Sequence, residues 1–326
     1  MENFVIRTHQ LKKIFSSREK GTARDVEAVA GIDLDVQQNE IFGLLGPNGA
    51  GKTTAMRMLC TLLSPTSGDA TVVEYDLQTQ HRQIRGHIGY VSQKGGMEKR
   101  QTGRENLLLQ ARLYGMERSN GQKRVNEVIE ALGLSSYADR RASTYSGGQK
   151  RIFDLASGII HKPKLLFLDE PTTGLDPHSR TRVWEEVKKL HREGTAIFLT
   201  THYLEEADML CSRVAIIDYG KIVALDNPAQ LKHQISGDSI ILGFERPDYA
   251  LKAMNILQTQ SFIDNVQNNE TALSFYVTNG DEAMPLIMNI VHQNDIPLKT
   301  IQLARPTLDD VFLKLTGRTM RESAEE

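Results

Sequence analysis

The chain has 326 residues, of which 40% are hydrophobic and 25% are charged, a length sufficient for roughly two domains of ~150 residues. Its 39 basic and 41 acidic residues give a net charge of −2. This balance lacks the basic excess of proteins that neutralise nucleic-acid phosphates, so we expect no nucleic-acid partner. Two cysteines, Cys60 and Cys211, exclude a disulfide framework and a zinc cage and are typical of a reducing compartment.

The N-terminal segment MENFVIRTHQLKK has no apolar signal-peptide core. No window of the sequence approaches 18 uncharged apolar residues, the length needed to span a bilayer. We therefore expect a soluble, cytoplasmic chain that does not itself cross a membrane.

The first 225 residues alternate apolar runs with helical patterns. Residues 41–45, 165–168 and 196–199 are nearly continuous apolar stretches, which predict strands buried on both faces of a parallel sheet. Between the runs, residues 56–63 place apolar side chains at the i, i+3, i+4, i+7 spacing of a helix. This alternation predicts an α/β core.

Two further segments belong to this first domain. Residues 103–160 are rich in helix formers and contain no convincing strand, so we expect a helical subdomain at about 95–160. Residues 213–218 and 221–224 flank the turn Tyr219-Gly220 and predict a hairpin that closes the core.

The pattern changes after Pro228. From 238 to 304 it predicts strand–helix–strand–strand–helix–strand, the split βαβ arrangement. A last helix is expected from Thr307, whose side chain can cap it while Asp310 reaches back. The sequence thus predicts two domains, 1–229 and 230–326. The second lacks a phosphate loop, a metal-ligand cluster and paired carboxylates, so we expect a regulatory or dimer-supporting accessory domain, with a merely stabilising appendage as the alternative.

Residues 46–54 match the pattern G-x-x-x-x-G-K-[ST] between a predicted strand and a predicted helix, the context that a P-loop requires. Such a loop points several backbone N–H groups at one phosphate. Lys52 supplies a charge for the β- and γ-phosphates, and Thr53 supplies a hydroxyl ligand for Mg²⁺. The expected nucleotide-binding residues of the loop are Gly46, Pro47, Asn48, Gly49, Ala50, Gly51, Lys52, Thr53 and Thr54.

An acidic pair follows the apolar run at 165–168. Asp169, at the carboxyl end of this predicted strand, is placed to bind Mg²⁺. Glu170 can hold the attacking water and accept its proton. The alternative is a solvated loop, which the P-loop makes the weaker interpretation.

Four further features are weak when each is taken alone. Ser146-Gly147-Gly148-Gln149 opens a predicted helix but could be a chance turn. Gln93 could be surface decoration, the segment 174–176 simply follows the acidic pair, and a lone His202 is more often structural.

Taken together, these motifs resemble the nucleotide-binding subunits of ATP-binding-cassette (ABC) transporters over about 4–228. The family's order is kept: P-loop at 46–54, Q-loop at Gln93, signature at 146–149, the Walker B motif with the acidic pair at 165–170, D-loop at 174–176 and H-loop at His202. The resemblance implies a P-loop NTPase fold with a RecA-like core, an antiparallel β subdomain and a helical subdomain. We expect a small α+β, ferredoxin-like domain to follow.

The resemblance also implies roles for these residues in a head-to-tail dimer that encloses two ATP molecules, with ATP and Mg²⁺ as cofactors. Lys52, Glu170 and His202 would be catalytic, and Thr53, Gln93 and Asp169 would surround the metal. Nucleotide contacts outside the P-loop would come from Phe15, Gln93, Ser146, Gly147, Gly148, Gln149 and Asp176. Phe15 would stack on adenine, although an apolar core residue is the alternative and 16–24 is an unusually long polar link.

One departure is Tyr145, because the family signature commonly begins with Leu. This leaves Ser146 and the glycines intact, so we expect it to affect packing more than chemistry. The segments EIFGLLGPNG, YSGG, TGREN and RPTLDDVFLKLTG resemble the daunorubicin-resistance-type ATPases, which partner ABC-2 membrane subunits in export.

This closer resemblance implies a homodimer or heterodimer bound to a separate ABC-2-type permease on the inner face of the cell membrane. The cargo would be a drug, a lipid or a polysaccharide. Three alternatives are a DNA-repair or chromosome-organising ABC ATPase, a ribosome-acting ABC protein and a nucleotide-gated switch. The first would need a long coiled coil and the second two cassettes, whereas the sequence has neither. Glu170 and His202 argue against the third.

Overall fold

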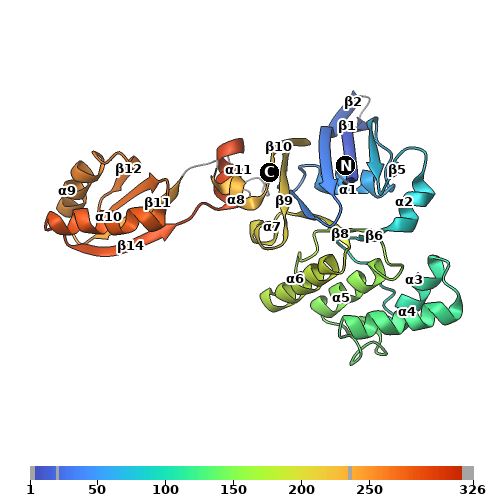
Figure 1. Cartoon of the computed structure of the whole chain (residues 1–326). Helices are drawn as coiled ribbons and strands as arrows, with labels where there is room; N and C mark the ends of the chain where they lie inside the picture. The colour runs from blue at the N-terminus through green and yellow to red at the C-terminus, as the bar shows by residue number, and fades with distance from the viewer. Residues whose placement is uncertain (1–3, 20–21, 234–236, 318–326) are drawn as a thin grey trace. The chain divides into compact units, whose positions relative to one another are not determined.

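The computed structural model describes residues 4–19, 22–233 and 237–317, which divide into two compact units on either side of the bond between Pro228 and Ala229 (Figure 1). This division lies next to the predicted boundary. In the part of the chain that the structure describes, no helix has the length and apolarity that crossing a bilayer requires.

A six-stranded sheet forms the centre of the first unit, in the order β10-β9-β3-β8-β7-β6. All its strands are parallel except the edge strand β10, which completes the predicted hairpin. β3, β7 and β8 are buried along their whole length, as their continuous apolar runs predicted. The strands are β3 (Ile41–Leu45), β6 (Ile88–Val91), β7 (Leu165–Asp169), β8 (Ala196–Thr201), β9 (Arg213–Asp218) and β10 (Lys221–Asp226).

A second, antiparallel sheet has the order β2-β1-β4-β5 and packs on the other side of α1 (Lys52–Leu59). Its strands are β1 (Phe4–Glu19), β2 (Thr22–Gln37), β4 (Ser67–Val72) and β5 (Tyr75–Asp76). α1 contacts β2, β7 and β8, so one core joins both sheets through this helix. α2 (His81–His87) leads from β5 into β6.

The helical subdomain lies below the central sheet in Figure 1 and lacks strands, as predicted. Its helices are α3 (Gly103–Leu113), α4 (Arg118–Ala131), the short η1 (Ala142–Thr144) and α5 (Gly147–Gly158). α5 packs against α6 (Pro177–Arg192), and α7 (Leu204–Leu210) follows β8. The ring of Tyr145 packs against Phe153, and its hydroxyl donates to the carbonyl of Tyr137, 2.7 Å away.

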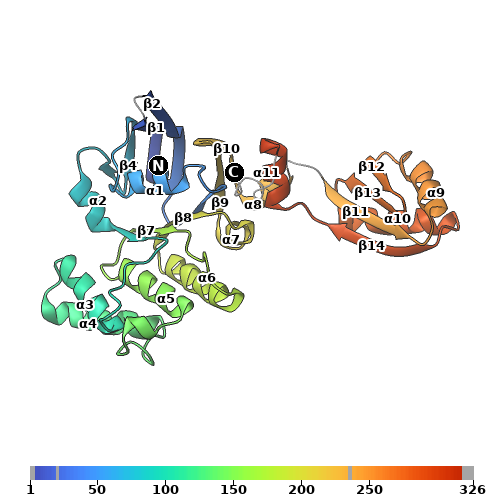
Figure 2. The same cartoon turned by 180° about the vertical axis from the view of Figure 1, so that it is seen from behind.

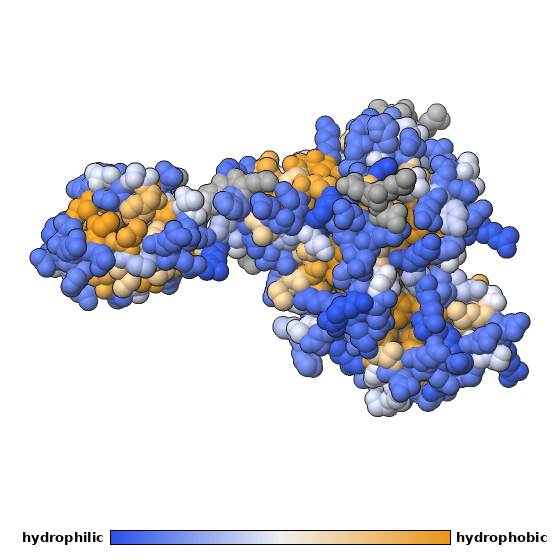
Figure 3. Space-filling view, in the orientation of Figure 1, coloured by the Kyte–Doolittle hydropathy of each residue, from blue (hydrophilic) through white to orange (hydrophobic). Residues whose placement is uncertain are grey.

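The second unit contains a four-stranded antiparallel sheet of order β12-β13-β11-β14, with α9 and α10 packed on it (Figure 2). The predicted element order is confirmed, and so is the Thr307–Asp310 capping box. Its elements are α8 (Pro228–His233), β11 (Asp238–Phe244), α9 (Pro247–Leu257), β12 (Ile263–Asn269), β13 (Ala272–Val277), α10 (Gly280–Gln293), β14 (Leu298–Ala304) and α11 (Leu308–Thr316). Figure 3 shows an apolar patch on this unit, whose helices expose Leu251, Leu286 and Met288.

Candidate active site

The P-loop joins β3 to α1 by a turn that requires glycine. Gly51 has φ = +104°, and a Cβ at this position would collide with the carbonyl oxygen of Ala28. Asn48 and Gly49 are exposed at the crest of the loop, whereas Gly46, Pro47 and Ala50 are buried. The chain therefore turns tightly into the N-terminus of α1, where free backbone N–H groups favour an anion.

Lys52, the first residue of α1, is 4% exposed. Its Nζ donates hydrogen bonds to the carbonyl oxygens of Gly46 (2.7 Å) and Pro47 (2.8 Å), and it lies 3.6 Å from Oε1 of Glu170. Burial lowers the pKa of Lys52, and the charge of Glu170 opposes this shift. The loop thus holds a cation where a bound polyphosphate requires neutralisation.

The carboxylate of Asp169 faces the P-loop from the end of β7. Its Oδ1 accepts hydrogen bonds from the hydroxyls of Thr53 (3.0 Å) and Thr200 (2.7 Å). Within the described residues, no cluster of three or more His, Cys, Asp or Glu could form an all-protein metal site. Mg²⁺ is typically held by one or two side-chain oxygens plus substrate phosphates, so Thr53 and Asp169 fit this ion.

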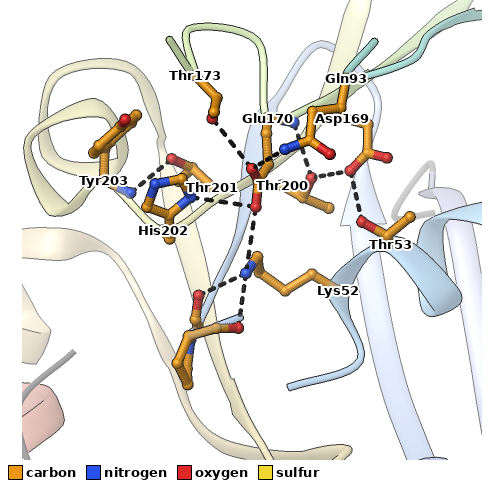
Figure 4. A network of polar contacts seen from close by, with 12 residues as sticks. Lys52, Thr53, Gln93, Asp169, Glu170, Thr173, Thr200, Thr201, His202 and Tyr203 are labelled. Carbon is orange, nitrogen blue, oxygen red and sulfur yellow. Dashed lines mark hydrogen bonds and ion pairs between the residues drawn. The ribbon is translucent and has the colours of Figure 1, made fainter. Parts of the chain in front are cut away.

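Glu170 is the centre of the site (Figure 4). Its Oε2 accepts hydrogen bonds from Nε2 of Gln93 (2.8 Å) and Oγ1 of Thr173 (3.1 Å). Its Oε1 lies 3.6 Å from Nζ of Lys52 and 3.2 Å from Nδ1 of His202. Nδ1 has no well-aligned hydrogen-bond partner, so this last contact is an ion pair that forms when the ring is protonated.

The surroundings of Glu170 keep its carboxylate ionised. Burial raises the pKa of Glu170, but the contact with His202 and the charge of Lys52 outweigh it, so the pKa lies below the ordinary 4.5. The backbone of Glu170 has φ = +44°, a conformation that costs a non-glycine residue about 1–3 kcal/mol. Its N–H donates to the carbonyl and hydroxyl oxygens of Thr200, both 3.1 Å away, which helps to hold this strained turn.

The signature and the D-loop lie side by side in this chain. Ser146 caps α5, and its side chain and that of Gln149 form a reciprocal capping box. A Cβ on Gly148 would collide with Ser179 in the first turn of α6, so this glycine permits the two helix ends to meet. Asp176 caps α6 and accepts hydrogen bonds from Ser179.

Phe15 is not a core residue, because it is 43% exposed. It pairs with Val26 across the β1–β2 hairpin, two positions from Ala28, whose carbonyl lies against the P-loop. The expected polar link at 16–24 was wrong: both strands continue through it, and only 20–21 lie outside the described residues. The contact of Phe15 with adenine stays a prediction.

Sequence reasoning missed Thr200, which contacts both Asp169 and Glu170, and Thr173, which contacts Glu170. Thr200 lies directly opposite Asp169 in the register of β7 and β8. A polar residue that ends an otherwise apolar strand was the available signal, because ligands gather at the carboxyl edge of a parallel sheet. Thr173 carried no such signal.

Comparisons with known proteins agree with this geometry. Two family models match the chain: "ABC transporter" at 29–173 and "ATP-binding protein DrrA1-3-like, C-terminal domain" at 227–316. The chain is 38% identical to daunorubicin resistance ATP-binding protein DrrA2 of Streptomyces coeruleorubidus, covering 100% of this chain and 99% of the relative. It is 34% identical to linearmycin resistance ATP-binding protein LnrL of Bacillus subtilis, with 90% and 95% covered.

A third relative, Nod factor export ATP-binding protein I of Rhizobium etli, is 35% identical with 92% of each chain covered. Among solved structures, the dimeric post-hydrolysis state of the ATP-binding cassette MJ0796 bound to ADP and Pi has a TM-score of 0.61. It covers 68% of this chain and 98% of its own at 22% identity, a likeness of fold.

Proposed function

The chain belongs to the ABC transporter family of ATP-binding proteins, and on this premise we propose which residues perform each step. It is an ATPase that converts ATP and water to ADP and phosphate and powers an ABC-2-type exporter. The relatives' names mention daunorubicin resistance, linearmycin resistance and Nod factor export, and we propose a drug, a lipid or a polysaccharide as the cargo of this chain. The membrane-spanning permease is a separate chain, to which this subunit binds at the inner face of the cell membrane.

One observation carries the catalytic assignment: residues from the P-loop, the Q-loop and the H-loop all contact the carboxylate of Glu170. Glu170 orients the attacking water and accepts its proton, because its lowered pKa keeps it ionised at neutral pH. Lys52 neutralises the β- and γ-phosphates. His202 contacts the γ-phosphate and orients Glu170, to whose carboxylate it lies close.

Thr53, Asp169 and Gln93 would hold Mg²⁺. When bound, the ion would neutralise charge that develops on the phosphates. The hydroxyl and carboxylate of the first two are within 3.0 Å of each other, which supports a common ligand. Gln93 directs its amide nitrogen at Glu170, so its carbonyl oxygen is the group left for a metal.

Two copies, or this chain and a related partner, complete each site. The first turn of α5, with Ser146 as its cap, presents backbone N–H groups to the γ-phosphate bound by the other subunit. Asp176, the N-cap of α6, is expected at the dimer interface beside the N-terminus of α5. ATP then joins the two subunits, and hydrolysis removes the phosphate that both contact.

Replacing Glu170 with Gln tests the base. The amide keeps the size of the side chain but cannot accept the proton, so turnover is expected to fall by at least ~100-fold. ATP still binds, and ATP-dependent dimers accumulate in size-exclusion chromatography. Glu185→Gln, at an exposed position of α6, is the matched control and retains activity. Near-normal ATP hydrolysis by Glu170→Gln would contradict the assignment of Glu170 as the catalytic base.

We also propose where the permease docks. A groove of about 230 Å³ lies between the Q-loop and α3, and its lining includes Ser92, Gly96, Leu109 and Leu113. The two leucines are 43% and 72% exposed. Because Gln93 in the same loop bonds Glu170, a permease segment in this groove would adjoin the catalytic centre.

Leu113→Glu tests this groove by placing a charge in an apolar contact. We expect the affinity for permease-containing vesicles to fall about 10–100-fold while ATPase activity of the isolated subunit is kept. Leu62→Glu, which changes another exposed leucine, three residues after the end of α1, is the control. Undiminished vesicle binding by Leu113→Glu, in a pull-down assay, would contradict the location.

A further inference from the structure

Arg151 is a buried arginine that the assignment above does not use. It lies on α5, five residues after the cap Ser146, and is 6% exposed. Its Nε donates to the carbonyl of Pro171 (2.6 Å), its Nη2 to that of Asp169 (3.0 Å), and its Nη1 to that of Ser92 (2.7 Å). All three guanidinium nitrogens thus bond backbone oxygens of other segments.

These three carbonyls have special positions. Asp169 and Pro171 are the residues on either side of Glu170, and Ser92 immediately precedes Gln93. Gln93 and Glu170 themselves bond each other, 2.8 Å apart. One guanidinium therefore fixes the backbone beside both members of the catalytic hydrogen bond. The planar fork of arginine reaches three acceptors at once, whereas the point charge of lysine lacks this geometry.

The same helix holds the far end of the Q-loop. Asp154, one turn after Arg151, accepts a hydrogen bond from the N–H of Gly96 (3.2 Å). A Cβ on Gly95 would collide with the Asp154 carboxylate, so loop and helix are closely fitted. α5 thus clamps the loop 92–96 with a cation at one end and an anion at the other.

The backbone of Glu170 requires such support. Its φ of +44° is a strained conformation, which persists only where the surroundings determine it. Thr200 holds the N–H of Glu170, and Arg151 holds the carbonyl on each side of it.

We propose that Arg151 is a positioning residue of ATP hydrolysis, which fixes Glu170 and Gln93 relative to each other and ties both to α5. It acts through the backbone carbonyls of Ser92, Asp169 and Pro171 that it bonds. Because α5 begins at Ser146, which meets the partner's ATP in the proposed dimer, Arg151 couples that contact to the base in its own chain. This inference rests on the proposed role of Glu170.

The test uses Arg151→Lys in the full chain, which keeps the charge and removes the fork. We expect the single-turnover rate of ATP hydrolysis to fall about 100-fold, the effect of misplacing a catalytic group by ~1 Å. The Kd for a fluorescent ATP analogue is expected to change less than about threefold. Arg124→Lys is the matched control and leaves the rate unchanged, since Arg124 bonds the carbonyls of Ile159 and Ile160 at the other end of α5.

A double variant separates positioning from general loosening of the fold. If Arg151 acts through Glu170, Arg151→Lys adds no further loss in the Glu170→Gln background. A wild-type rate in Arg151→Lys, equal losses of rate and ATP affinity, or an additive loss in the double variant would each overturn the proposal. An active Glu170→Gln variant would instead overturn the assignment of the base.

If Arg151→Lys does not fold, Asp154→Asn provides a second test of the proposal. It leaves Arg151 in place and weakens only the far anchor of the loop. We expect a smaller, roughly tenfold, loss of rate with ATP affinity kept. A wild-type rate in a folded Asp154→Asn variant, when Arg151→Lys does not fold, would count against the clamp.

Discussion

The two units of the chain differ in where they place charge. The first buries charged side chains, namely Lys52, Arg151, Asp169, Glu170 and Glu206. In the second, no charged side chain of the described residues is buried, and the core is entirely apolar. Charge pairs such as Arg305–Asp281, 2.9 Å apart, lie at the surface.

This difference indicates that the first unit carries the catalytic residues and that the second unit is a folded domain without them. Burying a charge is costly unless it is paired, so a fold keeps buried charges where they do something that packing cannot. The second unit has the alternating strands and two helices that a small closed core requires. We therefore propose that it supports assembly or coupling, and that chemistry belongs to the first unit alone.

The largest expected effect concerns whether the P-loop of one subunit requires the signature residues 146–149 of the other subunit for ATP hydrolysis. Ser146→Arg and Lys52→Ala are each expected to abolish hydrolysis. Mixed together, they form dimers with one composite site intact, and activity should return to roughly a quarter of wild type if subunits pair at random and sites fire singly. ATPase assays on mixtures, against each variant alone, measure this. Full activity in a strictly monomeric protein would contradict the composite site.

Truncation after Gln230 tests the division of labour directly. All residues expected to contact phosphate end at His202, and the two apolar cores are separate, so we expect ATP affinity to be kept. ATP-driven dimerisation should weaken on the order of tenfold, measured by sedimentation. Loss of ATP binding by a folded truncated protein would show that the domain boundary, or the role proposed for the second unit, is wrong. Unchanged dimerisation and unchanged coupling to the permease would leave only a stabilising appendage.

Much of the fold could be predicted because its signals are local. A continuous apolar run of five residues indicates a strand buried on both faces, and Thr307 with Asp310 indicates a helix start. The P-loop was predictable for the same reason, since its glycines, Lys52 and Thr53 are contiguous. The expected chemistry of Asp169 followed from its place at a strand end.

The contacts that make the site were not predictable. Gln93 meets Glu170 only because β6 and β7 are neighbours in the sheet, an order that no local pattern specifies. The strained backbone of Glu170 is likewise held by hydrogen bonds with Thr200 and Arg151, which belong to other elements of the fold. The strand segments 16–19 and 22–24 escaped notice because their polar sequence lacks the apolar alternation that predicts a strand.

The smallest expected effect concerns Glu206, a carboxyl in α7 with 0% exposure. Its Oε1 accepts hydrogen bonds from Oγ1 of Thr172 (2.8 Å) and Nε1 of Trp184 (3.0 Å). Burial raises the pKa of Glu206, while its hydrogen bonds and the charge of Arg151 oppose the shift. The described residues of the second unit hold no buried carboxyl of this kind.

The sign of the effect on stability follows from proton binding. Above the unfolded-state value near 4.5 the folded protein holds the Glu206 proton more tightly, so its stability falls as the pH rises toward the folded-state pKa. Glu206→Gln keeps the Oε1 acceptor and removes the titration. Between pH 5 and pH 8 the Tm of wild type should therefore drop more than that of the variant, because only wild type loses the stabilisation that the bound proton provides. Glu205→Gln, at an exposed position on the same helix, is the control, and its Tm should depend on pH as that of wild type does. If the Tm of Glu206→Gln shows the same pH dependence as wild type, the burial of Glu206 does not contribute to the pH dependence of stability.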